Sequence, residues 1–279
     1  MRHFEIKSGI TEGDAECQGV KLHYARIGTG DPIVFIHGTG LDCRMWVDQL
    51  TYFGKKYAAI AYDMRGFGLS SPLRGESYSP SDDLAALLDA LGYEAAHLVG
   101  LSRGSLTALE FALAYPQRLR RLILEGAYIN GLALSREYQE VKNEVEFVAQ
   151  RCGVDHAKRI WINSCLFASS LAYPGVNERL RLMLEAYNPW HWLHPSTEML
   201  IQPAAINRLE EIKAPTLIVL GKLDIPHFHN TAGILVSRLP AAKLVALADV
   251  GHLSPMENPL AFNTAVDEFL GSYSGGQQQ

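Results

Sequence analysis

The sequence has only four cysteines and no closely spaced pair of them. Zinc sites and dithiol redox sites need such pairs, and disulfide frameworks are typical of shorter secreted chains. A phosphate-binding glycine loop and a dinucleotide fingerprint are also missing, because Gly66-Phe67-Gly68 is too short to form either. We therefore expect free thiols, no metal and no cofactor.

Positive charge is not in excess. The chain has 25 lysines and arginines against 30 aspartates and glutamates, a formal charge of -5, and no cluster of basic residues stands out. This balance argues against a nucleic-acid partner. We expect a small-molecule substrate, and the sequence leaves a homo-oligomer open.

Long apolar runs are absent as well. No window reaches the roughly 18 apolar residues that a membrane-spanning helix requires. The first seven residues, MRHFEIK, carry charges where a secretory signal has an apolar stretch. We expect a cytoplasmic protein with no membrane partner.

Short apolar runs alternate with amphipathic helical stretches along most of the chain. Runs at 32–36, 57–62, 97–100, 122–124, 216–220 and 244–247 are typical of strands that are covered on both faces, and further strands are expected near 4–8 and 20–27. Leucines recur at helical spacing within 84–91 and 106–113. The alternation predicts an α/β fold with a mostly parallel central sheet flanked by helices.

The alternation stops between residues 131 and 208. Helical patterns at 137–150, 157–167 and 177–187 follow one another there without a strand run between them. We predict a helical lid at 131–208, inserted before the last two strands, with residues 1–130 and 209–271 forming the α/β core. The polar, low-complexity residues 272–279 are predicted to be a disordered tail.

The strongest local motif is Gly100-Leu101-Ser102-Arg103-Gly104, which follows an apolar strand and opens a helix. This is the G-x-S-x-G pattern of a nucleophile elbow, whose turn is too tight for side chains two residues either side of the serine. The helix that follows directs its free N–H groups toward the same place. We predict that Ser102 is a nucleophile.

A serine nucleophile needs a base, and the base needs a carboxylate to orient it. His252 follows the last predicted strand, and Asp224 lies at the carboxyl end of the strand before it. The order serine, acid, histidine therefore predicts a triad of Ser102, Asp224 and His252. Glu125, which ends an earlier strand, is the alternative acid. The alternative bases are His191, His194, His227 and His229.

Backbone N–H donors must stabilise the negative charge that develops on a reacting carbonyl oxygen. The amide of Arg103, next after the nucleophile, is one expected donor. The second is the amide of Thr39, in a loop whose flanking glycines let the backbone approach a substrate. Most aromatic residues of the predicted lid are expected to form the lid's own core, but some should contact substrate. The candidate substrate-binding residues are Gly38 in this loop and, in the predicted lid, Trp161, Trp190, His191 and Trp192.

These motifs, in this order, resemble the α/β-hydrolase superfamily. Besides the elbow and His252, the likeness covers HGTG at 37–40, DMRGFGLS at 63–70 and APTLIV at 214–219. The stretch LDCRMW at 41–46, followed by the D-x-R-G-F-G-x-S run, is similar to the serine-nucleophile branch that includes 3-oxoadipate enol-lactonases and related small-ester and lactone hydrolases. The resemblance implies an α/β-hydrolase fold and a serine hydrolase that cleaves a carboxylic ester or lactone of a small organic substrate.

Other functions on the same scaffold stay open. Hydrolases that cut carbon–carbon bonds of ring-cleavage products share much of the pattern, but they usually continue the loop as His-Gly-x-Gly-Pro-Gly, where this chain has Leu41-Asp42. A biosynthetic enzyme for cyclisation or lactonisation and a non-catalytic ligand receptor are further alternatives. Haloalkane dehalogenases and epoxide hydrolases have an aspartate nucleophile, so Ser102 argues against both.

Arg103 departs from the small or apolar residue that is common beside the nucleophile in these relatives. Its cation could bind a substrate carboxylate or the oxyanion. We favour the alternative that it forms a structural ion pair with Asp82, Asp83 or Glu110.

Overall fold

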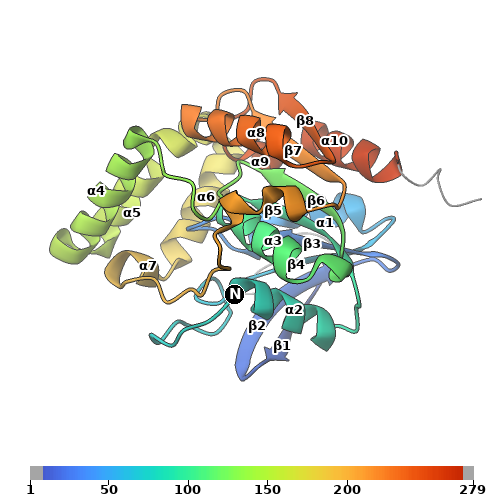
Figure 1. Cartoon of the computed structure of the whole chain (residues 1–279). Helices are drawn as coiled ribbons and strands as arrows, with labels where there is room; N and C mark the ends of the chain where they lie inside the picture. Colours follow the sequence, from blue (N-terminus) through green and yellow to red (C-terminus); the bar gives the residue numbers. More distant parts are fainter. Residues whose placement is uncertain (1–8, 273–279) are drawn as a thin grey trace, which may run out of the picture.

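The centre of the molecule is an eight-stranded sheet of order β1-β2-β4-β3-β5-β6-β7-β8, seen in a computed structural model that describes residues 9–272. β2 pairs antiparallel with β1 and β4, and the remaining neighbours are parallel (Figure 1). The strands are β1 Thr11–Cys17, β2 Val20–Ile27, β3 Pro32–Ile36, β4 Ala58–Tyr62, β5 Ala96–Leu101, β6 Leu119–Glu125, β7 Thr216–Gly221 and β8 Ala242–Leu247.

Helices flank this sheet. α1 packs against α10, and α2 packs against α3, which also contacts β5 and β6. The flanking helices are α1 Val47–Phe53, α2 Pro80–Ala90, α3 Arg103–Ala114, α8 Pro226–Arg238, α9 Ser254–Glu257 and α10 Pro259–Gly271. Every residue of β3, β4, β5 and β7 is buried, as expected for parallel strands covered on both faces. The predicted fold class is confirmed.

The edge strand β1 was not expected from the sequence. Its residues, TEGDAEC, are mostly polar and show no apolar run. The strand forms because Gln18 and Gly19 both adopt positive φ, which makes a two-residue turn that pairs β1 with β2 along its whole length. The strand expected near 4–8 lies outside the described residues.

Four α-helices lie between β6 and β7, and Figure 1 shows α4, α5 and α7 to one side of the sheet. Their bounds are α4 Arg136–Cys152, α5 Val154–Ile162, α6 Pro174–Ala186 and α7 Trp190–Leu193. The division into an α/β core and a separate lid at 131–208 stays a prediction, and the predicted tail falls almost wholly outside the described residues. Within residues 9–272, no helix is both long and apolar enough to span a bilayer.

Candidate active site

Ser102 sits at the turn between β5 and α3 in a backbone conformation that a serine rarely adopts. Its φ is 54° and its ψ is -113°, in the left-handed half of conformational space. The strain is held by the surrounding backbone, because the Ser102 amide donates to the Glu125 carbonyl at 2.9 Å and the Ser102 carbonyl accepts from Ser105.

The two glycines of the elbow, Gly100 and Gly104, are required because a side chain would not fit at either position. A Cβ on Gly100 would lie 2.4 Å from the carbonyl oxygen of Gly104. A Cβ on Gly104 would lie 2.1 Å from the carbonyl oxygen of Ile36, at the end of β3. Real Cβ atoms do not come this close to backbone, so only glycine lets α3 begin directly over the sheet. The elbow geometry predicted from the sequence is therefore present.

Asp224 and His252 meet as the sequence suggested. Asp224 follows β7, and its Oδ2 accepts a hydrogen bond from Nδ1 of His252 at 2.9 Å, while its Oδ1 accepts from the amide of Ile225 at 2.8 Å. Both side chains are buried, and the His252 ring stacks on Phe228 with centroids 4.3 Å apart. His252 and Ser102 line one small cavity. The arrangement suits a base that is oriented by a carboxylate.

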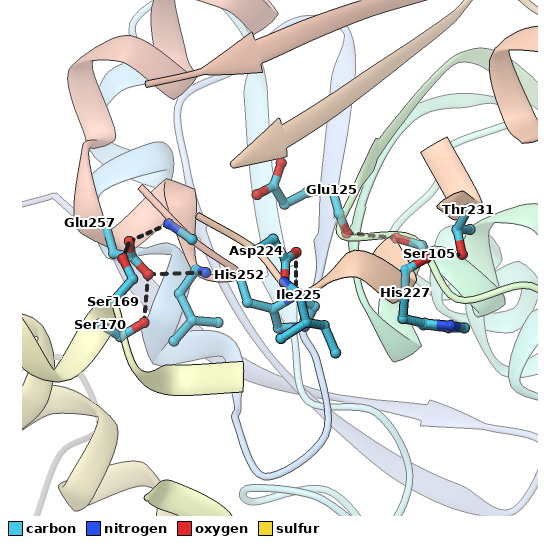
Figure 2. A network of polar contacts seen from close by, with 12 residues as sticks. Ser105, Glu125, Ser169, Ser170, Asp224, Ile225, His227, Thr231, His252 and Glu257 are labelled. Carbon is cyan, nitrogen blue, oxygen red and sulfur yellow. Dashed lines mark hydrogen bonds and ion pairs between the residues drawn. The ribbon is translucent and has the colours of Figure 1, made fainter. Parts of the chain in front are cut away.

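The loop that carries His252 is held by Glu257, which the sequence analysis did not single out. The Glu257 carboxylate accepts hydrogen bonds from the amides of Gly251 and Leu253 on either side of His252, at 2.7 and 3.3 Å. It also accepts from the hydroxyls of Ser169 and Ser170, which lie between α5 and α6 (Figure 2). One buried carboxylate thus joins the loop that carries His252 to the segment between β6 and β7.

The loop after β3 is fixed by a neutral histidine. The Nδ1–H of His37 donates to the Gly38 carbonyl at 2.8 Å, and its Nε2 accepts from the amide of Met64 at 3.0 Å. Complete burial lowers the pKa of His37 to about 4, so the ring stays uncharged. The loop held in this way carries Thr39, which lines the same cavities as Ser102. Arg103 is the first residue of α3, so its N–H has no partner within the helix.

The D-x-R-G-F-G-x-S run at 63–70 supports the loop after β3. Its acid, Asp63, makes hydrogen bonds inside the fold rather than facing the cavity. Asp63 accepts from the amides of Cys43 and Leu69 at 2.7 and 2.8 Å. Burial, and then the nearby Asp42, raise the pKa of Asp63 to about 6. A Cβ on Gly68, whose φ is 50°, would overlap the Asp63 carboxylate, which explains the glycine at that position.

A cavity of about 570 Å³ opens beside Ser102, a size typical of small-molecule sites. Its walls come from the elbow, from α4 and from the segment around α7. Thr39, Arg103, Trp161, His191 and Trp192 are among its lining residues.

Of the remaining predicted substrate-binding residues, Gly38 lines the smaller cavity with His252. Trp190 lines neither of these two cavities, and its ring packs on His194 with centroids 4.7 Å apart.

His191, in α7, has an unusual setting. Its ring stacks on Phe67 at a centroid distance of 4.8 Å, and neither ring nitrogen has a hydrogen-bond partner. Burial, with Arg103 nearby, lowers its pKa to about 2. His191 therefore presents an uncharged ring to the cavity. The alternative base His227 instead accepts from the Ser135 amide at 3.2 Å.

Arg103 does form an ion pair, but with none of the three expected partners. Its guanidinium donates to the carboxylate of Glu198, which lies between α7 and β7. The three expected acids are engaged elsewhere: Asp82 accepts from Tyr115, Asp83 pairs with Arg65, and Glu110 accepts from Asn130 and the Ile201 amide. The predicted ion pair is present, but the predicted partners were wrong, because the guanidinium reaches Glu198, between α7 and β7, rather than an acid on α2 or α3.

The alternative acid Glu125 is completely buried at the end of β6, and Figure 2 shows it near Asp224. Burial raises its pKa well above the usual range, and the charges of Asp224 and Glu257 raise it further, while Ser254 opposes the shift. A carboxyl that holds its proton cannot orient an imidazole as a carboxylate does. Asp224, which accepts a hydrogen bond from His252, is the better acid.

Within residues 9–272, donor side chains that could hold a metal come together at His23, Cys43 and Asp63, whose ligand atoms lie within 4.8 Å of one another. Asp63 is already bound by two amides, and Nδ1 of His23 lies 2.9 Å from an Asp14 carboxylate oxygen. These contacts already use Asp63 and His23 as hydrogen-bond partners within the fold.

The comparisons with known proteins agree with this fold. The family model described as alpha/beta hydrolase fold matches residues 31–259. The chain belongs to this family. The predicted superfamily is thereby confirmed, while the catalytic roles of the individual residues stay predictions.

Relatives of this α/β-hydrolase carry several activities. It is 30% identical to a 2-hydroxy-6-oxononadienedioate/2-hydroxy-6-oxononatrienedioate hydrolase of Paraburkholderia xenovorans, over 94% of this chain and 93% of the relative. It is 28% identical to 3-oxoadipate enol-lactonase 2 of Acinetobacter baylyi, over 97% and 98%. A solved esterase of Thermogutta terrifontis superposes with a TM-score of 0.80 at 28% identity, over 93% of this chain and 98% of the esterase.

Proposed function

We propose that this protein is a serine hydrolase that cleaves a carboxylic ester or lactone of a small organic substrate through an acyl-enzyme. The observation that carries the proposal is the site itself: a strained Ser102 shares a cavity wall with His252, whose Nδ1 donates to Asp224. The named esterase and enol-lactonase relatives support the same chemistry.

The reaction proceeds in two steps, acylation of Ser102 and hydrolysis of the acyl-enzyme. Ser102 Oγ attacks the carbonyl carbon while His252 Nε2 takes the hydroxyl proton, and the amides of Thr39 and Arg103 stabilise the oxyanion. The carbon–oxygen bond to the leaving alcohol then breaks, and His252 returns the proton to that oxygen. Water enters, gives a proton to His252 and attacks the acyl carbon, and the acid leaves as Ser102 regains its proton. Asp224 holds the imidazole throughout.

The test is turnover of p-nitrophenyl acetate, p-nitrophenyl butyrate and an enol-lactone by the wild type and by Ser102→Ala. The control is Ser237→Ala, which removes an exposed hydroxyl on α8. We expect turnover that falls at least about a thousandfold in Ser102→Ala and is unchanged in Ser237→Ala. Equal turnover by the wild type and Ser102→Ala would refute the proposal.

The second candidate is hydrolysis of a carbon–carbon bond in a ring-cleavage product, favoured by the likeness to the Paraburkholderia hydrolase. A ring-cleavage dienoate added to the same panel separates the two, because its cleavage changes its absorption spectrum. Turnover of the dienoate with inert esters would favour this candidate.

A further inference from the structure

The cation beside the nucleophile is already neutralised. Arg103 lines the large cavity, and its guanidinium donates to the Glu198 carboxylate. Only 8% of the Glu198 side chain and 19% of the Arg103 side chain are exposed. A pair this buried is held much more firmly than a surface pair, because water screens it little.

Glu198 is positioned by its backbone as well as by its charge. The chain on either side of it pairs with Tyr78: the Tyr78 amide donates to the Thr197 carbonyl at 3.2 Å, and the Met199 amide donates to the Tyr78 carbonyl at 2.8 Å. The Tyr78 hydroxyl donates to Glu198 Oε1 at 3.0 Å. The carboxylate is therefore fixed against Arg103 and is not free to turn into solvent.

The charges that face the cavity cancel. The charged lining residues are two cations, Arg103 and Lys142, and two anions, Glu146 and Glu198. Two histidines also line it, His194 and His191, and burial lowers the pKa of His191 so that its ring stays uncharged. A substrate carboxylate entering this cavity would lose hydration without meeting an uncompensated cation near Ser102. A guanidinium carries five N–H donors, so Arg103 can still donate to an uncharged substrate oxygen.

We propose that Glu198 is a specificity-determining residue, which by pairing with Arg103 selects esters or lactones whose acyl part is uncharged and disfavours those that carry a carboxylate. The inference rests on the proposed ester or lactone hydrolysis. It predicts that removing the Glu198 charge converts Arg103 into a carboxylate-binding residue.

The test compares substrates that differ only in charge. Monomethyl succinate, glutarate and adipate are paired with their neutral ω-amides, which have the same shape, and ester cleavage is followed by methanol release. The readout is the ratio of kcat/KM for the acid to kcat/KM for the amide, so general losses of activity cancel. In the wild type we expect this ratio to be about one tenth or less at the chain length that reaches Arg103.

Glu198→Gln keeps the shape of the side chain and removes its charge. We expect it to raise the ratio about tenfold or more, the range of a charge-assisted hydrogen bond gained by the acid alone. The matched control is Glu146→Gln, which changes the cavity charge equally without freeing Arg103, and its ratio should stay within about twofold of the wild type. Arg103→Gln combined with Glu198→Gln should abolish the gain.

The inference is overturned if the ratio in Glu198→Gln stays near the wild-type value, if Glu146→Gln gives the same gain, or if the gain persists without Arg103. Should Glu198→Gln alone fail to fold, the double variant still decides: removal of both charges should leave the wild-type ratio nearly unchanged, and a large fall would mean that Arg103 already recognises carboxylates. If the wild type cleaves none of the neutral esters, the proposed function fails instead.

Discussion

Gly104→Ala is the sharpest test of the elbow. The added Cβ would lie 2.1 Å from the Ile36 carbonyl oxygen, whereas ordinary contact begins at 3.4 Å, so the first turn of α3 must move away from β3 by about 1.3 Å. We expect a loss of about 1–3 kcal/mol in the free energy of unfolding, from overpacking against backbone. We also expect a fall of roughly a hundredfold in kcat/KM, because a 1 Å displacement of a nucleophile has an effect of that size.

The matched control is Gly233→Ala, on the exposed face of α8, where an added Cβ meets nothing within 4 Å. The same chemical change should there stabilise the protein by about 0.4–1 kcal/mol, because alanine restricts the unfolded chain, and ester turnover should not change. Urea unfolding and p-nitrophenyl butyrate hydrolysis provide both measurements. If Gly104→Ala keeps wild-type stability and activity, the steric account of the elbow is wrong.

Three further predictions concern groups that the triad does not include. Glu257→Gln removes a charged acceptor from both amides that flank His252, so kcat/KM should fall about tenfold or more while the fold is kept; unchanged kinetics would contradict the bracing role. Burial lowers the pKa of His37 to about 4 from 6.5, so its stability contribution is full above pH 6.5 and is lost as the pH falls toward 4. The loss of unfolding free energy between pH 7 and pH 5 should therefore be about 2 kcal/mol smaller in His37→Gln than in the wild type, and equal losses would refute this. Burial raises the pKa of Glu125, so its contribution is full below pH 4.5 and is lost as the pH rises. The melting temperature of Glu125→Gln, compared with the wild type, should gain more at pH 8 than at pH 4.5, and a constant difference would count against the buried protonated acid.

Much of this architecture was predictable because its signals are local. Buried parallel strands require continuous apolar runs, and β3 and β7 show them. The elbow is encoded by five consecutive residues, 100–104, so its motif can be recognised in the sequence. The order of Ser102, Asp224 and His252 along the chain then places them at the carboxyl ends of strands that meet at one edge of the sheet.

The features that were missed depend on pairings between distant residues. β1 is stabilised by hydrogen bonds to β2, and a polar edge strand leaves no apolar pattern to detect. Glu198 lies 95 positions after Arg103, and nothing in its neighbourhood marks it as the partner. Glu257 follows His252 closely, but its role emerges only when Ser169 and Ser170 are folded against it.

The Glu257 contacts couple the segment between β6 and β7 to the position of the base, His252. Any motion that draws Ser169 and Ser170 away from the sheet removes two of the donors that hold the carboxylate beneath the His252 loop. Admission of a substrate by such a motion would loosen the base, and closure would seat it again. The protein would then be most reactive only when its cavity is shut, which keeps the acyl-enzyme and the water that attacks it within one enclosed space.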